Sequence, residues 1–255
     1  MPGLRPVVAS GAALAVVIAG LVATLVVLAH RPPVGGAAPT VPVAAPSAVP
    51  EAAGIPSSDP SSGSAPVPTP SPAWVTTVAA RTAIPARALQ AYAQAQLDVA
   101  REDPSCRIGW NTLAGIGAVE SAHGTHGGSA IGADGIDRPT VLGPPLDGTD
   151  GNLAIPDTDG GRLDGDPVWD RAVGPMQFVP STWAQWGRRA SGVGTPDPSD
   201  IDDAALTAAT YLCTVGGDLG TPAGWRAAIA AYNAPVEYAV LVADTANEYA
   251  ARSRT

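Results

Sequence analysis

WNTLAGIGAVESAHG, residues 110–124, is the stretch that predicts how the folded part of this chain is built. Leu113, Ile116 and Gly117 fall at positions i, i+3 and i+4, which is the spacing of the apolar face of a helix. Glu120 follows at i+7 and lies on that same inward face, one turn beyond Ile116. Gly124 supplies a stop signal for the helix. We therefore expect a central helix that carries a carboxyl group on its buried side.

The expected surroundings of Glu120 favour the protonated acid. An ionised carboxylate on the apolar face of a helix is costly unless it is paired, protonated or exposed in a cleft. Glu120 also lies near the C-terminal end of its helix, where the helix dipole disfavours a negative charge. Both effects raise the pKa, and a carboxyl that keeps its proton is what a general acid requires. A structural glutamate that caps a helix or forms a salt bridge is the alternative.

The first 31 residues are predicted to be a membrane anchor. Residues 7–29 are apolar or small except for Ser10 and Thr24, and 23 such residues are enough to cross a hydrocarbon core. The run is longer than the apolar region of a usual signal peptide, and no small-x-small cleavage pattern precedes His30. We expect an uncleaved single-pass anchor with the rest of the chain on the outer side of the membrane. Cleavage would instead give a secreted protein.

Residues 32–72 are predicted to be a disordered linker. Twelve of the 27 prolines of the chain lie in these 41 residues, and most of the others are Ala, Ser, Gly and Val. Such a composition cannot bury a core and is typical of a tether that is partly polyproline II. The folded domain is then expected over residues 73–255.

The charge of the chain limits its partners. The formal net charge is −9, with 14 arginines, no lysine, five glutamates and 18 aspartates, which argues against binding to nucleic acid. Nine aspartates lie between positions 134 and 170. Four of them have a spacing that resembles a calcium loop: Asp157, Asp159, Asp164 and Asp166. Because Val168 stands where an EF-hand has its terminal glutamate, a solvated acidic loop is the alternative to a calcium site.

The two cysteines, Cys106 and Cys213, have no spacing typical of metal ligands. Outside the cytoplasm, such a pair is most simply a disulfide, and two buried thiols are the alternative. The bridge would tie the segment before the Glu120 helix to a later helix and contribute on the order of 4 kcal/mol.

The folded part is predicted to be all-α. Apart from the Glu120 helix, helical spacing and start signals place helices at about residues 85–102, 180–190, 200–213, 222–232 and 236–251. Residues 125–173 form a long insertion rich in Gly, Asp and Pro, without helical or strand periodicity. An irregular stretch of this length within a compact domain is usually functional or disordered.

Three segments in this order resemble the lytic transglycosylases of bacterial cell walls: AVES at 118–121, VGPMQFVPSTW at 173–183 and AAYNAP at 230–235. The middle segment is long and specific, and it is most similar to the membrane-bound lytic transglycosylase B type. The resemblance covers roughly residues 84–249. It implies a lysozyme-like (SLT-type) helical domain with a groove for peptidoglycan glycan strands, located on the cell-wall side of the membrane.

The resemblance also implies a reaction and the residues that perform it. The β-1,4 bond between N-acetylmuramic acid (MurNAc) and N-acetylglucosamine (GlcNAc) would be broken by the muramic C6 hydroxyl, leaving a 1,6-anhydro end, with Glu120 as the single acid/base. Ser121 would hold the substrate N-acetyl group, and Tyr232 would hydrogen-bond Glu120. The remaining residues carried over are Met176, Gln177 and Phe178 at the groove and Asn233 at a local turn.

The residues themselves leave some roles open. A second carboxylate, which most glycosidases use, is not evident in a fixed motif, although Asp170 and the insertion offer candidates. His123 and His126 do not form a convincing metal pair and are interpreted as polar residues at the groove edge. No cofactor is required by this chemistry, and the sequence names no protein partner. A hydrolytic muramidase of the same fold and a non-catalytic glycan-binding scaffold are the alternative functions.

Overall fold

The computed structural model describes residues 43–45, 68–149 and 151–254. Seven α-helices lie in these ranges: α1 Pro72–Thr82, α2 Ala86–Glu102, α3 Trp110–Ser121, α4 Pro180–Trp186, α5 Ile201–Gly216, α6 Pro222–Tyr232 and α7 Val236–Arg254. The predicted all-α character of the folded part is therefore confirmed, with helices near every predicted position. The predicted anchor at residues 1–31 lies outside the described residues. Of the helices that the structure describes, none has both the length and the hydrophobicity that crossing a bilayer requires.

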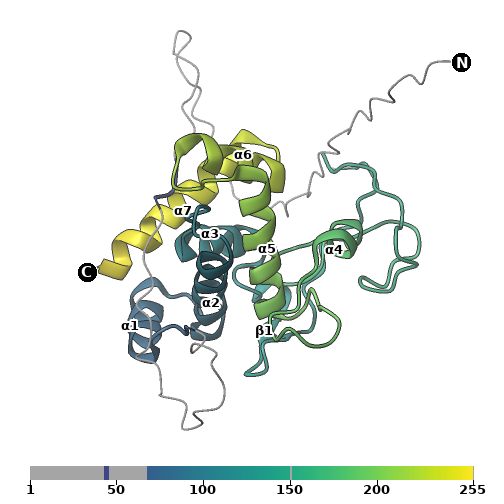
Figure 1. Cartoon of the computed structure of the whole chain (residues 1–255). Coiled ribbons are helices and arrows are strands. Elements are labelled where there is room, and N and C mark those ends of the chain that lie inside the picture. The colour runs from purple at the N-terminus through teal and green to yellow at the C-terminus, as the bar shows by residue number, and fades with distance from the viewer. Residues whose placement is uncertain (1–42, 46–67, 150, 255) are drawn as a thin grey trace, which may run out of the picture.

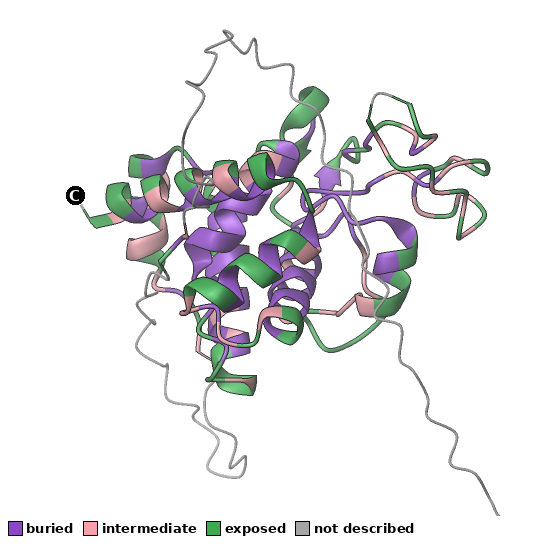
Figure 2. Cartoon of the chain, turned by 90° about the horizontal axis from the view of Figure 1, so that it is seen from above, coloured by how far each residue is buried: buried purple, intermediate pink, exposed green. Residues whose placement is uncertain are grey.

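The helix α3 lies at the centre of the helical part and packs against both α2 and α7 (Figure 1). The helix α5 packs against α2 on one side and α6 on the other. Figure 2 shows that the helices at the centre of the bundle are buried along most of their length, while exposed residues lie on its outer helices, including the outer side of the C-terminal helix α7. The core includes several aromatic side chains with almost no exposure: Tyr92, Trp110, Phe178, Trp225 and Tyr232.

The central helix ends three residues earlier than the sequence predicts. Ala122 and His123 adopt left-handed backbone conformations with φ of 51° and 60°, so Gly124 is not needed as the stop. The His123 N–H donates to the Gly117 carbonyl over 2.8 Å, and the Ala122 N–H donates to the Ala118 carbonyl over 3.1 Å. These two bonds satisfy carbonyl groups that the helix end would leave without partners.

The long insertion is mostly irregular, as predicted, but it contains short strand pairing. The strands β1 Ala130–Ile131 and β2 Asp137–Arg138 pair in antiparallel fashion, with Ala130 opposite Arg138. A short 3-10 helix, His126–Gly128, precedes them. The insertion then extends away from the helical bundle beside α4 (Figure 1). It returns to the core at Val173, which forms an isolated bridge with Phe178.

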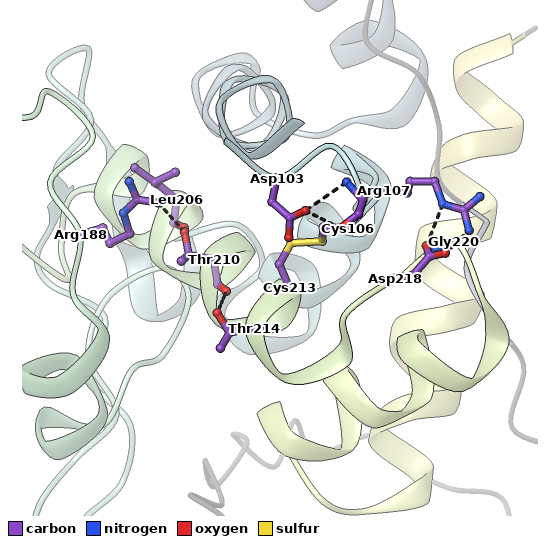
Figure 3. Close-up of a disulfide and its surroundings, with 11 residues drawn as sticks. Asp103, Cys106, Arg107, Arg188, Leu206, Thr210, Cys213, Thr214, Asp218 and Gly220 are labelled. Carbon is purple, nitrogen blue, oxygen red and sulfur yellow. Dashed lines mark hydrogen bonds and ion pairs between the residues drawn. A yellow bond between two sulfur atoms is a disulfide. The ribbon is translucent and has the colours of Figure 1, made fainter. Parts of the chain in front are cut away.

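The predicted disulfide is confirmed. Cys106 and Cys213 are bridged with their Cα atoms 5.4 Å apart, so the bond ties the segment before α3 to the last turns of α5 (Figure 3). The Leu219 N–H also donates to the Cys106 carbonyl, which holds the chain after α5 against the same segment. The disulfide therefore fixes the approach to the central helix.

Two short pieces of the predicted linker are placed on the folded part. Ser71, inside the predicted linker, caps α1 by accepting the Trp74 N–H, so the helical part begins at Pro72. Further upstream, residues 43–45 lie against α3 and α7, with Ala44 buried in the core cluster. The other residues of the predicted linker lie outside the described ranges except for 68–70, so the disorder predicted for the linker stays a prediction.

Candidate functional site

The carboxyl group of Glu120 is placed by the close packing of α3 on α7. A Cβ atom on Gly115 would come within 2.8 Å of the Val242 carbonyl oxygen, so only glycine allows the two backbones to approach this closely. Tyr238 lies one turn before Val242 on α7. It faces Glu120, which lies about one turn after Gly115 on α3. The two helices are therefore antiparallel at the site, and each contributes one side chain to the pair.

Glu120 is a buried acid whose two oxygens differ in their surroundings. The residue is 1% exposed. The Tyr238 hydroxyl donates to Glu120 Oε1 over 2.7 Å, whereas no described group hydrogen-bonds Oε2. Burial raises the pKa of the Glu120 carboxyl to about 8, and the hydrogen bond from Tyr238 opposes this in part. At neutral pH the carboxyl is therefore protonated, as its position on the apolar helix face predicts.

The tyrosine that hydrogen-bonds Glu120 is Tyr238, and not Tyr232 as expected. The Tyr232 hydroxyl donates to the Met176 carbonyl over 2.8 Å rather than to Glu120. Burial raises the Tyr232 pKa, and the charge of an ionised Glu120 raises it further. The two tyrosines end α6 and begin α7, on either side of the break at residues 233–235. That break turns the second phenol, not the first, toward the acid.

The segment from Val173 to Phe178 forms a tight turn beside α3. The two end residues exchange both backbone hydrogen bonds, at 2.9 and 3.0 Å. Gly174, with φ 79°, lies directly against the Pro198 carbonyl, where a Cβ atom has no room. Gln177 adopts φ 53° although it is not glycine, which is a strained conformation held by the surrounding turn.

The predicted groove residues Met176 and Gln177 are both buried in this turn. The Met176 sulfur lies 3.4 Å from the position of a Cβ atom on Gly117, so it packs on the helix that carries Glu120. Gln177 donates through Nε2 to the carbonyls of Val141 and Gly174, at 3.2 and 2.9 Å. No described group hydrogen-bonds its Oε1 atom. Gln177 therefore keeps one buried acceptor that a ligand could use.

Ser121 fastens this turn to α3. Its hydroxyl donates to the Pro175 carbonyl over 2.6 Å and accepts the Gly124 N–H at 2.7 Å. The hydroxyl proton is thus used inside the protein, so holding a substrate N-acetyl group would require this bond to break. Asn233 is buried at the C-terminal end of α6, where its N–H donates to the Ile229 carbonyl over 2.9 Å.

All seven residues carried over from the resemblance are buried, so the structure is closed around the acid. A hollow of about 700 Å³ lies elsewhere, between α2, α5 and the chain after α4. Arg87, Asp98, Arg188 and Asp202 line it, and Glu120 does not. Any ligand that reaches Glu120 must therefore displace part of its cover.

His123 was expected at the edge of a groove, but it is buried. Its Nδ1 atom lies 3.2 Å from the Tyr92 hydroxyl, and its Nε2 atom lies 2.9 Å from the Tyr249 hydroxyl. Burial lowers the His123 pKa to about 4, so the imidazole is neutral at physiological pH. This chain of three side chains links α2 and α7 to the end of α3. His126 is exposed, as expected.

Asp170, a candidate second carboxylate, is engaged within the insertion. It is fully buried and accepts the Thr158 N–H at 2.9 Å and the Thr158 hydroxyl at 2.7 Å. Burial raises its pKa. These contacts identify Asp170 as the residue that closes the acidic loop on itself.

The four calcium candidates also bind their own loop. Asp157 and Asp159 accept backbone N–H groups of the residues that follow them. Asp164 accepts the N–H groups of Asp166 and Arg171, and Asp166 pairs with the Arg171 side chain. Within the described ranges no group of three or more His, Cys, Asp or Glu side chains is arranged to hold a metal ion. Calcium binding stays a prediction, which calorimetric titration with calcium would test.

The chain was compared with protein-family models, curated proteins and solved structures, and none of them matches it significantly. The likeness to lytic transglycosylases therefore rests on the three sequence segments. In the structure two of them, AVES and VGPMQFVPSTW, meet through the bond from Ser121 to Pro175. The third segment joins them through the bond from Tyr232 to the Met176 carbonyl.

Proposed function

We propose that this chain is a peptidoglycan lytic transglycosylase with a lysozyme-like helical domain, and that Glu120 is its single acid/base. The observation that carries the proposal is the burial of the Glu120 carboxyl with Tyr238 donating to one of its oxygens, and this burial raises the Glu120 pKa to about 8. A general acid must carry its proton at working pH and must be held in one orientation. Glu120 meets both conditions.

The reaction needs one proton to move twice. Glu120 donates its proton to the glycosidic oxygen as the bond from that oxygen to the muramic C1 breaks. The resulting carboxylate then takes the proton of the muramic C6 hydroxyl while C6 oxygen bonds to C1. The acid is regenerated, and the sugar ends as a 1,6-anhydro ring with no water added. The substrate N-acetyl oxygen stabilises the oxocarbenium-like transition state, as in substrate-assisted glycosidases.

The two oxygens of Glu120 suit separate tasks in this scheme. Oε1 accepts from Tyr238, which fixes the plane of the carboxyl group. Oε2 has no hydrogen-bond partner among the described residues, so it is the oxygen that can carry the transferred proton. The unpaired Oε1 acceptor of Gln177 lies in the adjacent turn and offers a contact for a substrate N–H or O–H group.

Product analysis on purified peptidoglycan tests the proposal. Mass spectrometry should find 1,6-anhydromuramic ends, and Glu120→Gln should lower turnover at least about 100-fold because glutamine cannot transfer a proton. Glu237→Gln is the matched control, since Glu237 is exposed on the first turn of α7, next to Tyr238. Reducing ends would instead identify a hydrolytic muramidase. The absence of any cleavage by the wild type would contradict both enzymes.

The burial of Glu120 favours a second candidate, a non-catalytic glycan-binding scaffold. In that case Glu120 is a neutral structural residue that joins α3 to α7 through Tyr238. The scaffold binds glycan strands without cutting them, and Glu120→Gln leaves its function in cells unchanged. Cleavage by the wild type that is lost in Glu120→Gln would exclude it.

A further inference from the structure

A short piece of the predicted linker, residues 43–45, is bound to the folded part by two asparagine side chains. Asn111 donates through Nδ2 to the Ala45 carbonyl over 2.8 Å. Asn247 donates through Nδ2 to the Val43 carbonyl over 3.1 Å, and its Oδ1 accepts the Ala45 N–H at 3.4 Å. Between these contacts, Ala44 is 1% exposed and belongs to the core cluster. In Figure 1 this segment is the short purple piece beside α7.

These hydrogen bonds are all made to backbone atoms of the segment and not to its side chains. A carboxamide carries both donors and an acceptor, so one asparagine can pair with a C=O and an N–H of the same peptide. The carbonyl of one residue and the N–H two residues later point to the same side in an extended strand. Asn247 binds this pair of groups, which is the way sheet edges bind added peptides. The side chains contribute as well, since Ala44 is buried and Val43 packs against the core cluster.

The asparagines lie at the opposite end of the α3–α7 pair from the acid. Asn111 and Asn247 are each nine residues from Glu120 and Tyr238 along their helices. At 1.5 Å per residue this separation is about 13 Å. Asn111 also donates to the Ala246 carbonyl over 3.3 Å, so its amide is oriented by α7 as well as by the segment.

We propose that the cleft between α3 and α7 at Asn111 and Asn247 is a docking site for residues 43–45 of this chain, which fastens the linker to the end of the domain remote from Glu120. The site takes a short extended peptide with a small central residue. It accounts for two polar side chains and a buried alanine that the proposed catalytic function does not use.

Docking limits how far the domain can move from an anchor at residues 1–31, a consequence that rests on the proposed membrane-anchored enzyme. Covalent geometry allows at most about 3.6 Å per residue. The eleven residues 32–42 therefore span at most about 40 Å, whereas the forty residues 32–71 would span up to about 140 Å if nothing were docked. Docking also brings the linker to the end of the domain that is remote from Glu120. The docked residues therefore leave the end that carries Glu120 free for a glycan strand.

Thiol labelling of the full chain tests the docking without measuring activity. Because Cys106 and Cys213 are bridged, a single new cysteine is the one reactive thiol. Ala44→Cys places it at the buried position, and Ala45→Cys places it at the neighbouring exposed position as the matched control. We expect Ala44→Cys to react with a maleimide at least about 10-fold more slowly than Ala45→Cys.

Undocking should remove that protection. Adding Asn247→Ala to Ala44→Cys should raise its labelling rate toward that of Ala45→Cys, whereas Asn152→Ala, an asparagine in the insertion, should leave it unchanged. Hydrogen exchange at the Ala45 amide of the otherwise unaltered chain covers the case in which a cysteine does not fit at position 44. Equal labelling rates at positions 44 and 45, together with exchange at Ala45 that Asn247→Ala does not accelerate, would overturn the proposal. Because neither measurement uses glycan cleavage, its failure is separate from failure of the proposed enzyme.

Discussion

Replacing Glu120 by glutamine should change how the stability of the folded chain depends on pH. In the unfolded chain the carboxyl ionises near its usual pKa of 4.5, whereas burial in the folded chain raises its pKa to about 8. Between these two values the unfolded state releases a proton that the folded state keeps, so the free energy of unfolding falls as pH rises. Glutamine keeps the shape of the side chain and does not titrate. The variant should therefore lack this loss.

The size of the effect follows from the pKa difference. Each pH unit within the window removes about 1.4 kcal/mol from the free energy of unfolding of the wild type. Between pH 5 and pH 7.5 the wild type should therefore lose about 3 kcal/mol relative to Glu120→Gln. With a urea dependence of about 2 kcal/mol per molar, the difference between the two unfolding midpoints should change by roughly 1.5 M.

Urea unfolding at several pH values, followed by tryptophan fluorescence with the disulfide intact, measures this difference. Other titrating groups, such as His123 with its pKa lowered to about 4, contribute equally to both proteins and cancel. Glu237→Gln, at an exposed position, should differ from the wild type by an amount that does not depend on pH. If the difference for Glu120→Gln is equally flat, the carboxyl ionises in its usual range and the basis for its acid role is lost.

Three further predictions concern the packing around the acid. Tyr238→Phe removes the hydrogen bond that lowers the Glu120 pKa, so the pH at which the wild-type loss levels off should rise, and turnover in the proposed enzyme should fall about 10-fold or more; an unchanged pH profile would contradict this. Serine at Cys106 and Cys213 should lower the free energy of unfolding by about 4–5 kcal/mol, because the two cysteines are 107 residues apart in the sequence and their bridge closes a long loop; urea titration of the double variant measures it, and a loss under 1 kcal/mol would contradict the entropic account. Gly117→Ala places a methyl group against the buried Tyr92 hydroxyl and should lower the free energy of unfolding by about 1–3 kcal/mol, which thermal unfolding measures. An unchanged stability would mean that the core around the acid is loosely packed.

The sequence carried enough information to place the acid but not its partner. Periodicity put Glu120 on the buried face of its helix, because that face depends only on spacing along one element. Tyr232 and Tyr238 are both buried and flank the same chain break. Which phenol turns toward the acid depends on the angle between α6 and α7, and no spacing rule within one helix contains that angle. The one available signal for Tyr238 was its position, two residues after the first residue of a helix that packs on α3.

Two other features also arise from contacts that the residue spacing does not encode. The left-handed end of α3 at Ala122 depends on bonds back to its own last turn, which override the missing glycine. The docking of Ala44 depends on Asn111 and Asn247, which lie far apart in the sequence and face one cleft only after α3 and α7 have packed. Composition describes what a linker cannot bury by itself. Composition does not predict that the folded domain has a site that binds part of the linker.

In the proposed enzyme, burial gives Glu120 its proton and also keeps substrate away, and the proposed acid has to satisfy both conditions. An opening that let in bulk water would remove the desolvation that raises the pKa to about 8, and the carboxyl would ionise before it could act. An opening filled by a sugar ring still excludes bulk water from the carboxyl and supplies the glycosidic oxygen as the missing partner of Oε2. The proton is then kept until it is transferred. If the cover costs about 3 kcal/mol to displace, the open state is populated at about 1%, and glycan binding must supply that energy.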